Sequence, residues 1–225
     1  MIGDPANPNS LSTKLRSRRD IQLRALIRAI SVENGSVSIL DVGGTEIYWH
    51  RVGLEFLSDH HVTVTLLNIT SDSVVKTDED SIFRRMVGDG CDLSFFRDNN
   101  FQLAHSNSVI EHVITWTNMK NFASEIRRVA RYYYVQTPYF WFPVDPHFYR
   151  FPLFHWLPRP IRARLLSWLP LATAGRMRGV DASYSAVDGA RLLDLRQFRF
   201  LFPDARISFE FFAGFPKSML AVKGG

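Results

Sequence analysis

The sequence predicts an α/β protein in which a doubly wound, mostly parallel sheet of seven strands ends in an antiparallel hairpin. Three observations lead to this fold class. β-rich segments alternate with helical patterns along most of the chain, which is typical of a parallel sheet with helices on both faces. The segment 38–42 stops at a glycine pair, as strands of such sheets often do before a helix. The last two β-rich segments are joined by a connection too short for a parallel crossover.

The first predicted element is a basic amphipathic helix within residues 1–34. Leucine and isoleucine recur there at roughly helical spacing. The basic residues of the same segment are Lys14, Arg16, Arg18, Arg19, Arg24 and Arg28.

The glycine pair follows the first predicted strand. Residues 38–42 are mostly apolar and suit a buried parallel strand. Gly43 and Gly44 allow the backbone to turn sharply and to approach a ligand where a Cβ atom would collide. A helix that begins near Thr45 would direct its free amide groups toward an anionic group. The pattern therefore predicts a nucleotide-type binding turn.

The remaining elements follow in chain order. The further predicted strands are residues 61–68, 83–87, 101–106, 132–136, 207–212 and 218–222. The predicted helices between them are residues 47–57, 119–130 and 190–201. The short connection at residues 214–216 requires the last two strands to run antiparallel.

An insertion interrupts this alternation at residues 140–187, where the sequence is aromatic, proline-rich and basic. Between residues 146 and 180 it contains no acidic residue. Its aromatic side chains predict one of two roles. They would form either a lid that closes a ligand pocket or a surface that binds anionic, partly apolar material at a membrane. We expect residues 1–225 to form a single domain that includes this insertion.

Composition limits where the chain works and what it binds. The net charge of +5 suggests nucleic acid as a partner, but the charge is concentrated in the N-terminal segment and in the insertion. The single cysteine, Cys91, cannot form an internal disulfide, which favours a reducing compartment. Residues 1–10 lack the apolar core of a secretory signal, and no apolar stretch is long enough to span a bilayer. We expect a cytoplasmic protein, either soluble or peripheral to a membrane.

Several segments together resemble the class I S-adenosylmethionine-dependent methyltransferases of the small-molecule type, similar to methyltransferase type 11. The segments that carry the resemblance are residues 39–44 (ILDVGG), 88–93 (GDGCDL), 101–113 (FQLAHSNSVIEHV) and 192–205. The resemblance covers most of the chain. It implies a Rossmann-like fold, methyl transfer of the EC 2.1.1 type and S-adenosyl-L-methionine as cofactor.

The resemblance also implies which residues meet the cofactor. The glycine turn would hold its methionine end, the end of the second strand its ribose, and the segment after the third strand its adenine. The residues at these positions, with one from the end of the fourth strand, are Asp41, Gly43, Gly44, Asn68, Asp89, Gly90, Cys91 and Ser106. The family usually has a carboxylate at the ribose position, whereas the Asn68 side chain offers one carbonyl acceptor and an amide donor. The family also often has a further glycine where this chain has Thr45 and Glu46.

Asp145 and His147 are the predicted catalytic residues. Methyl transfer from a sulfonium is an in-line displacement, so a hydroxyl acceptor also needs a group that takes its proton. Both residues follow the fifth strand, and open parallel sheets bind ligands outside the carboxyl ends of their strands. His147 would act as general base and Asp145 would orient it; the alternative is that both are exposed loop residues. The seven histidines and one cysteine show no metal-ligand spacing, so no metal site is predicted.

Three functions remain open. The first is methylation, at oxygen, of a small molecule or glycan. The second is methylation of a nucleic acid, although residues 106–108 (SNS) replace the Asn- or Asp-Pro-Pro-aromatic signature typical of enzymes that modify base amines. The third is a binding protein that keeps the cofactor fold without catalysis. A dehydrogenase is disfavoured because the turn lacks a third glycine and no acidic residue ends the second strand.

Overall fold

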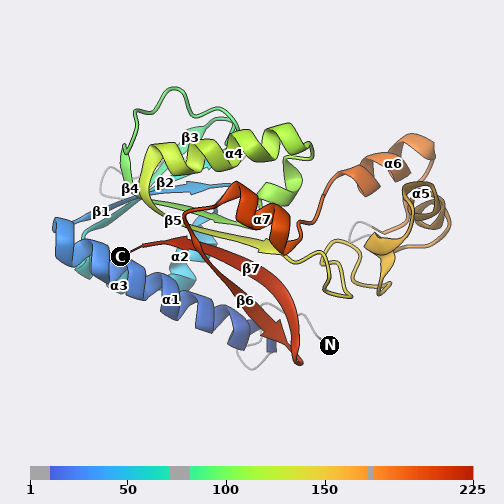
Figure 1. Cartoon of the computed structure of the whole chain (residues 1–225), viewed down its shortest axis with the longest axis horizontal. Coiled ribbons are helices and arrows are strands. Elements are labelled where there is room, and N and C mark those ends of the chain that lie inside the picture. Colours follow the sequence, from blue (N-terminus) through green and yellow to red (C-terminus); the bar gives the residue numbers. More distant parts are fainter. Residues whose placement is uncertain (1–10, 71–81, 172–174, 225) are drawn as a thin grey trace.

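The computed structural model describes residues 11–70, 82–171 and 175–224 and confirms the predicted fold class (Figure 1). Its seven-stranded sheet has the order β3-β2-β1-β4-β5-β7-β6. The strands are β1 (Val37–Val42), β2 (Val62–Asn68), β3 (Phe83–Val87), β4 (Phe101–Asn107), β5 (Ala130–Pro138), β6 (Arg206–Phe212) and β7 (Phe215–Lys223). The first five strands pair in parallel, whereas β7 is antiparallel to both β5 and β6. The strand order reverses between β1 and β4, which is where sheets of this kind form a ligand crevice.

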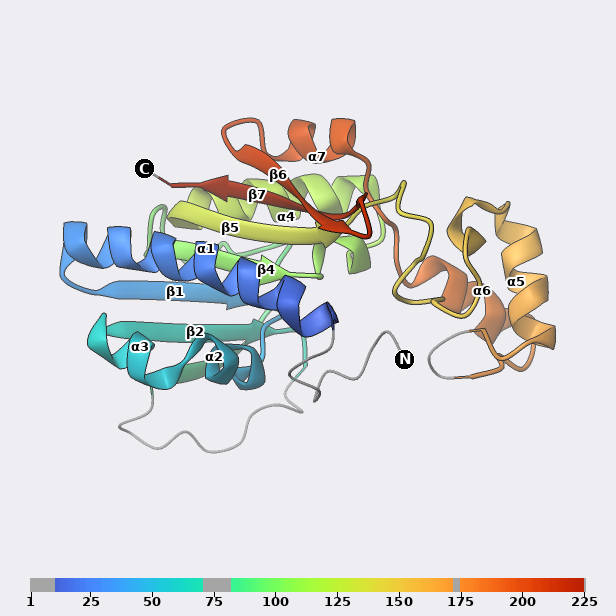
Figure 2. The same ribbon diagram turned by 90° about the horizontal axis from the view of Figure 1, so that it is seen from below.

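Helices cover both faces of the sheet, with α4 and α7 on one side and α1, α2 and α3 on the other (Figures 1 and 2). The helices are α1 (Leu11–Asn34), α2 (Glu46–Val52), α3 (Leu54–Asp59), α4 (Trp116–Val129), α5 (Arg159–Trp168), α6 (Val180–Asp188) and α7 (Leu195–Leu201), with short 3₁₀ turns η2 (Ile110–His112) and η3 (Phe154–Trp156). Alternate residues of β1 belong to different cores. Ile39 packs with α1 and α2, and Leu40 packs with α4 and α7. Both faces of the strand are therefore buried, which explains its nearly continuous apolar sequence.

The described part of α1 is amphipathic, because Leu23, Ile27 and Ile30 are buried while most residues between them are exposed. The side chains of Lys14, Arg16, Arg18 and Arg19 lie outside the described residues, as do residues 1–10. Within the described part of the chain, none of the helices has both the length and the apolar character needed to cross a bilayer.

Two helix predictions are wrong at their boundaries. The helix expected at 47–57 is divided into α2 and α3 at Gly53, whose φ of 112° is incompatible with a continuous helix. The helix expected at 190–201 begins only at Leu195. Asp194 caps it in a capping box with Gln197, and the preceding Leu193 forms a β-bridge to Tyr139 instead.

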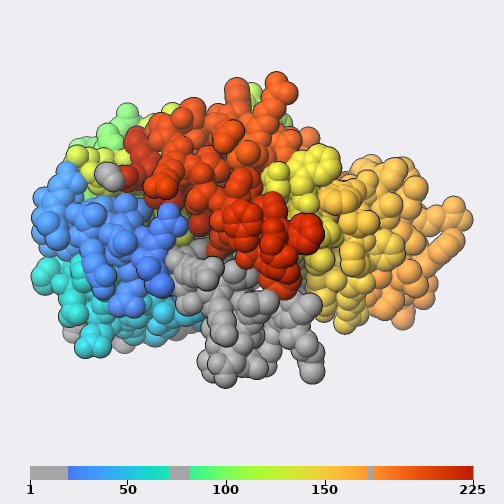
Figure 3. All heavy atoms as spheres, turned by 60° about the horizontal axis from the view of Figure 1, so that its bottom comes forward, coloured from blue at the N-terminus to red at the C-terminus, as the bar shows by residue number. Residues whose placement is uncertain are grey.

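The insertion, residues 140–187, extends beyond the carboxyl end of β5 and forms one end of the molecule (Figures 1 and 3). It has a small apolar core of its own, made by Phe148, Phe154, Ala163, Leu166, Leu171 and Val187. Three of its tryptophans remain outside this core: Trp141, Trp156 and Trp168 are 57%, 40% and 58% exposed. Aromatic side chains in the insertion thus serve both its packing and its surface.

Candidate functional site

The glycine turn after β1 admits no side chain at either position. Gly43 has a φ of +74°, and its N–H donates to the carbonyl of Leu67 at 2.7 Å. A Cβ on Gly43 would lie 2.4 Å from Cγ2 of Val109, and a Cβ on Gly44 would lie 1.6 Å from a carboxylate oxygen of Asp41. Because neighbouring side chains occupy these spaces, both positions need glycine.

Asp41 fixes this turn from inside the protein. Its carboxylate is fully buried, accepts a hydrogen bond from Trp49 Nε1 at 2.7 Å and meets Nδ1 of His105 at 2.7 Å. Ser106 is also fully buried, and its hydroxyl donates to the carbonyl of Val42 at 3.1 Å. Both residues were predicted to contact a cofactor directly. In the structure their polar groups instead hold α2 and β4 against the end of β1, so a ligand would meet the backbone of the turn.

Asn68, at the end of β2, is joined to the same turn. Its side-chain amide donates to the carbonyl of Gly44 at 3.0 Å, while part of the residue remains exposed. The next strand, β3, is followed by Asp89, whose carboxylate accepts from the N–H of Cys91 at 2.8 Å. A Cβ on Gly90 would lie 2.6 Å from Cγ1 of Val42, so this loop packs directly on the end of β1. The three predicted cofactor segments therefore form one continuous edge.

Cys91 is not a nucleophile in this arrangement. Burial, together with the charge and the hydrogen bond of Asp89, raises the pKa of its thiol to about 12. The thiol therefore stays protonated near neutral pH, whereas a nucleophilic cysteine needs the thiolate.

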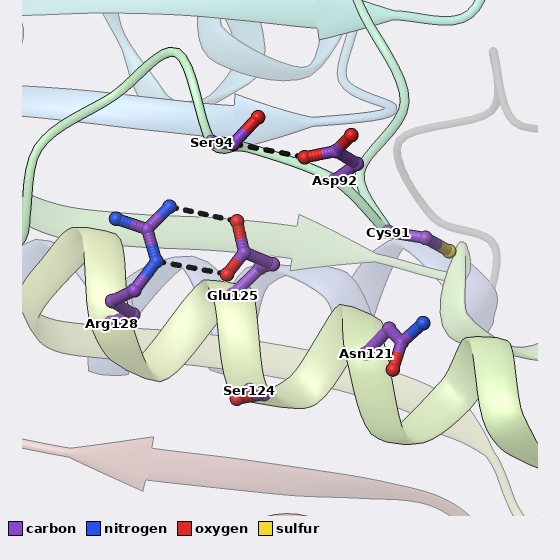
Figure 4. Close-up of a pocket in the computed structure, with 7 residues that line it drawn as sticks. All are labelled: Cys91, Asp92, Ser94, Asn121, Ser124, Glu125 and Arg128. Carbon is purple, nitrogen blue, oxygen red and sulfur yellow. Dashed lines mark hydrogen bonds and ion pairs between the residues drawn. The ribbon is translucent and has the colours of Figure 1, made fainter.

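A cavity of about 400 Å³ adjoins this loop, between residues 91–94 and helix α4 (Figure 4). On α4, Arg128 donates to the carbonyls of Leu93 and Phe96 at 2.9 Å and pairs with Glu125 at 2.8 Å. Glu125 in turn accepts from the N–H of Leu93 at 2.7 Å. Arg128 and Glu125 thus fasten the loop to α4. The sequence analysis did not find this pair, although its i, i+3 spacing on a predicted helix is a recognisable signal.

Asp145 and His147 meet, although only one residue separates them. Asp145 is buried, and one of its carboxylate oxygens accepts from the backbone N–H of His147 at 2.8 Å and from Nδ1 of its ring at 2.7 Å. Burial lowers the pKa of His147, but the hydrogen bond and charge of Asp145 and the charge of Glu111 outweigh it, so the net pKa is raised. The structure therefore contradicts the alternative in which both residues are exposed loop residues.

Two residues after β4 complete this cluster. His112 Nδ1 lies 2.8 Å from the carbonyl oxygen of Gly189, and its Nε2 lies 3.3 Å from Nε2 of His147. Glu111 is fully buried and accepts from the hydroxyl of Thr137 at 3.0 Å. Burial raises the pKa of Glu111 to about 7. The sequence analysis gave Glu111 no role, although an acidic residue next to a histidine at the end of a predicted strand was a visible signal.

Comparison with known proteins gives a family match. Residues 50–132 match the sequence model of a family described as "Methyltransferase domain", of the type Methyltransf_11. A comparison with curated proteins found no match.

Three solved structures illustrate the fold likeness. The PH0226 protein from Pyrococcus horikoshii OT3 has a TM-score of 0.54 and 17% identity, over 97% of this chain and 96% of that chain. A SAM-dependent methyltransferase from Archaeoglobus fulgidus has a TM-score of 0.53 and 13% identity, over 92% and 94%. A protein from Rhodobacter sphaeroides described among putative Zn-dependent alcohol dehydrogenases has a TM-score of 0.52 and 11% identity, over 86% of each chain. At these identities the likeness concerns the fold alone.

The family match and the sheet order together confirm the resemblance stated from the sequence. The matched family is one of methyltransferases, for which chemistry of the EC 2.1.1 type and S-adenosylmethionine as methyl donor are implied.

Proposed function

We propose that this chain, with its methyltransferase domain match, methylates a hydroxyl group of a small molecule or glycan with S-adenosylmethionine as donor. The observation that carries the proposal is the position of two groups at the carboxyl ends of the parallel strands. One is the open glycine turn after β1, and the other is the Asp145–His147 pair after β5. Open parallel sheets bind ligands at this edge.

The glycine positions fit the cofactor. Neighbouring side chains fill the Cβ positions of Gly43, Gly44 and Gly90, whereas Gly43 itself is exposed and the other two are partly exposed, so a ligand would meet the backbone of these residues from the solvent side. Asn68 and Asp89 flank the turn and would meet the ribose and adenine. When bound, the cofactor supplies an activated methyl group on a sulfonium. Asp41 and Ser106 support the turn from its buried side.

His147 is proposed to take the proton of the acceptor hydroxyl. Its Nδ1–H donates to Asp145, which fixes the tautomer and leaves the Nε2 electron pair as the basic site. The carboxylate of Asp145 also stabilises the imidazolium that forms when Nε2 accepts the proton. Because Asp145 holds both the backbone and the ring of His147, the ring orientation is set before any acceptor arrives.

Substitution of His147 tests this assignment. His147→Ala should lower turnover by about 10²- to 10⁴-fold, which is the usual contribution of a general base, and should leave the affinity for S-adenosylmethionine unchanged. Calorimetric titration with the cofactor gives the affinity. Mass spectrometry of extracts incubated with isotope-labelled donor identifies the methylated product and then measures its rate of formation.

The matched control is His50→Ala, which changes an exposed histidine on α2 and should leave both quantities unaltered. Normal turnover of the His147 variant would remove it as the base. If the unmodified chain does not bind S-adenosylmethionine, the result would instead favour the third function, a protein that keeps the cofactor fold without catalysis.

The insertion is proposed to act as a lid over the acceptor and to make a peripheral contact with an anionic membrane from the cytoplasmic side. Exposed Trp156 and Trp168 lie in a segment without acidic residues, and the guanidinium of Arg164 lies over the ring of Trp168 at 4.7 Å. Indole rings with neighbouring cations suit the interface of a bilayer. Sedimentation with anionic vesicles should show binding that weakens with salt and with Trp168→Ala. If the protein does not sediment with the vesicles, only the proposed role of the insertion as a lid remains.

Methylation of a nucleic acid is the second candidate. The basic charge of the chain favours it, whereas the residues at the end of β4 lack the signature for base amines. Competition by RNA in the labelled-donor assay separates this candidate from the first.

A further inference from the structure

We propose that Glu111, His112 and His147 bind a divalent transition-metal ion, with Zn²⁺ as the best fit. One ligand atom from each residue lies within 4.8 Å of the other two. Glu111 and His112 belong to the turn after β4, and His147 belongs to the loop after β5. The three donors therefore come from two segments, which converge at the carboxyl edge of the sheet.

The hydrogen bonds of the two histidines prepare their Nε2 atoms for a cation. His112 Nδ1 faces the Gly189 carbonyl oxygen, which can only accept, so Nδ1 carries the hydrogen and a neutral ring has its electron pair on Nε2. His147 Nδ1 faces the Asp145 carboxylate in the same way. Histidines that bind metals in proteins typically donate their other N–H to a carbonyl or carboxylate. Both rings of this cluster follow that pattern.

The distance between the two Nε2 atoms matches tetrahedral zinc. Zn–N bonds of about 2.0–2.1 Å at a tetrahedral angle place two nitrogen ligands about 3.3 Å apart. The observed distance is 3.3 Å. A cation bound by both Nε2 atoms would fit this separation.

Glu111 supplies an independent observation. Its side chain is fully buried, and its Oε1 atom has no hydrogen-bond partner among residues 11–70, 82–171 and 175–224. A buried carboxylate oxygen without a partner is costly unless a positive charge compensates it. The other oxygen is held by the hydroxyl of Thr137, which fixes the orientation of the carboxylate. A cation bound by the two histidines would provide the missing partner.

The donor set indicates the kind of ion. Two imidazoles and one carboxylate suit Zn²⁺ and related transition metals, whereas Mg²⁺ and Ca²⁺ prefer oxygen donors. Three protein ligands leave one coordination position open, as in catalytic zinc sites. Spacing along the chain predicts no metal site, because these residues come together only in the fold.

The metal proposal does not depend on the proposed methyl transfer, because binding of the ion is measured without donor or acceptor. The two proposals differ for His147. An ion at Nε2 would occupy the electron pair that base catalysis requires, so base action by His147 would belong to the metal-free protein. The test therefore measures binding of the metal itself.

The experiment uses the full chain, stripped with EDTA and dialysed, and titrated with Zn²⁺ in a calorimeter and with Co²⁺ in an absorption spectrometer. We expect one equivalent of each ion and an intense visible absorption of tetrahedral Co²⁺. Removing a ligand should weaken binding at least as much as the 10- to 100-fold seen for residues that only support ligands. His112→Gln and Glu111→Gln should both show this loss, and His50→Gln should bind as the unmodified chain does.

Circular dichroism checks that each variant is folded. His112→Gln keeps the test decisive if Glu111→Gln does not fold, because His112 lies at the surface. The proposal is overturned if the unmodified chain binds no stoichiometric Zn²⁺ or if a folded His112→Gln retains full affinity.

Discussion

Replacement of Gly44 by alanine should destabilise the protein through a single contact, the one with Asp41. The new Cβ would lie 1.6 Å from Oδ2 of Asp41 and 2.0 Å from its Cγ, so the carboxylate must move. That movement breaks the hydrogen bonds from Trp49 Nε1 and His105 Nδ1, both buried. Hydrogen bonds to charged groups contribute about 1.5–3 kcal/mol each, so we expect a loss of about 3–6 kcal/mol in the free energy of unfolding.

Urea unfolding followed by circular dichroism measures this loss, with an osmolyte in all samples so that weak variants stay folded. Gly35→Ala is the matched control. Its φ is +77° but its Cβ would meet nothing within 4 Å, so it should cost only the backbone strain of about 1–2 kcal/mol.

A double-mutant cycle decides the cause. In an Asp41→Ala background the obstructing carboxylate is gone, so Gly44→Ala should cost less than about 1 kcal/mol there. An equal cost in both backgrounds would refute the contact with Asp41 as the reason for glycine at this position.

Two further predictions concern α4 and the carboxyl end of α7. Arg128→Met should lower both the free energy of unfolding and the affinity for S-adenosylmethionine, because loop 91–98 loses the hydrogen bonds from Arg128 and keeps the one from Leu93 N–H to Glu125. Urea unfolding and calorimetry measure these quantities. An unaltered affinity would separate the loop from the proposed cofactor site. Burial raises the pKa of Asp204, but hydrogen bonds from Tyr133, Lys223 and Arg127 outweigh it and hold the pKa at about 2. Since the pKa in the folded state lies below the ordinary value of 3.8, Asp204 stabilises the fold above about pH 4, and this contribution disappears as the pH falls toward 2. Asp204→Asn should make the unfolding free energy less dependent on pH in that window, and an identical pH profile would contradict the reasoning.

Much of the proposed cofactor site, at the carboxyl edge of the parallel strands, was predictable because it depends on local sequence. A strand that stops at a glycine pair needs no distant contact to be recognised, and the carboxyl ends of neighbouring parallel strands lie at one edge of any such sheet. Gly43, Gly44, Asn68 and Asp89 lie at the carboxyl edge of the parallel strands, whereas their contact with a cofactor stays a prediction. The direction of Asp41 and Ser106 was not predictable, because it depends on Trp49 and His105, which approach from other elements.

The acceptor side depended more on the fold. The pair of Asp145 and His147 was visible in the sequence, but an extended segment would have kept their side chains apart. The observed turn brings them into contact, since the Asp145 carboxylate binds the backbone and the ring of His147 together. The packing of loops after β4 and β5 then adds Glu111 and His112, which no spacing along the chain connects to His147.

The sequence by itself determined the alternation of strands and helices, the order of the cofactor segments and the hairpin, because periodicity, glycine and short connections act over a few residues. Only the tertiary structure decided which polar side chains face inward and which ones converge between β4 and β5. Such convergence depends on long-range packing, where residues far apart in the chain share one buried environment and change the charge, orientation and pKa of one another.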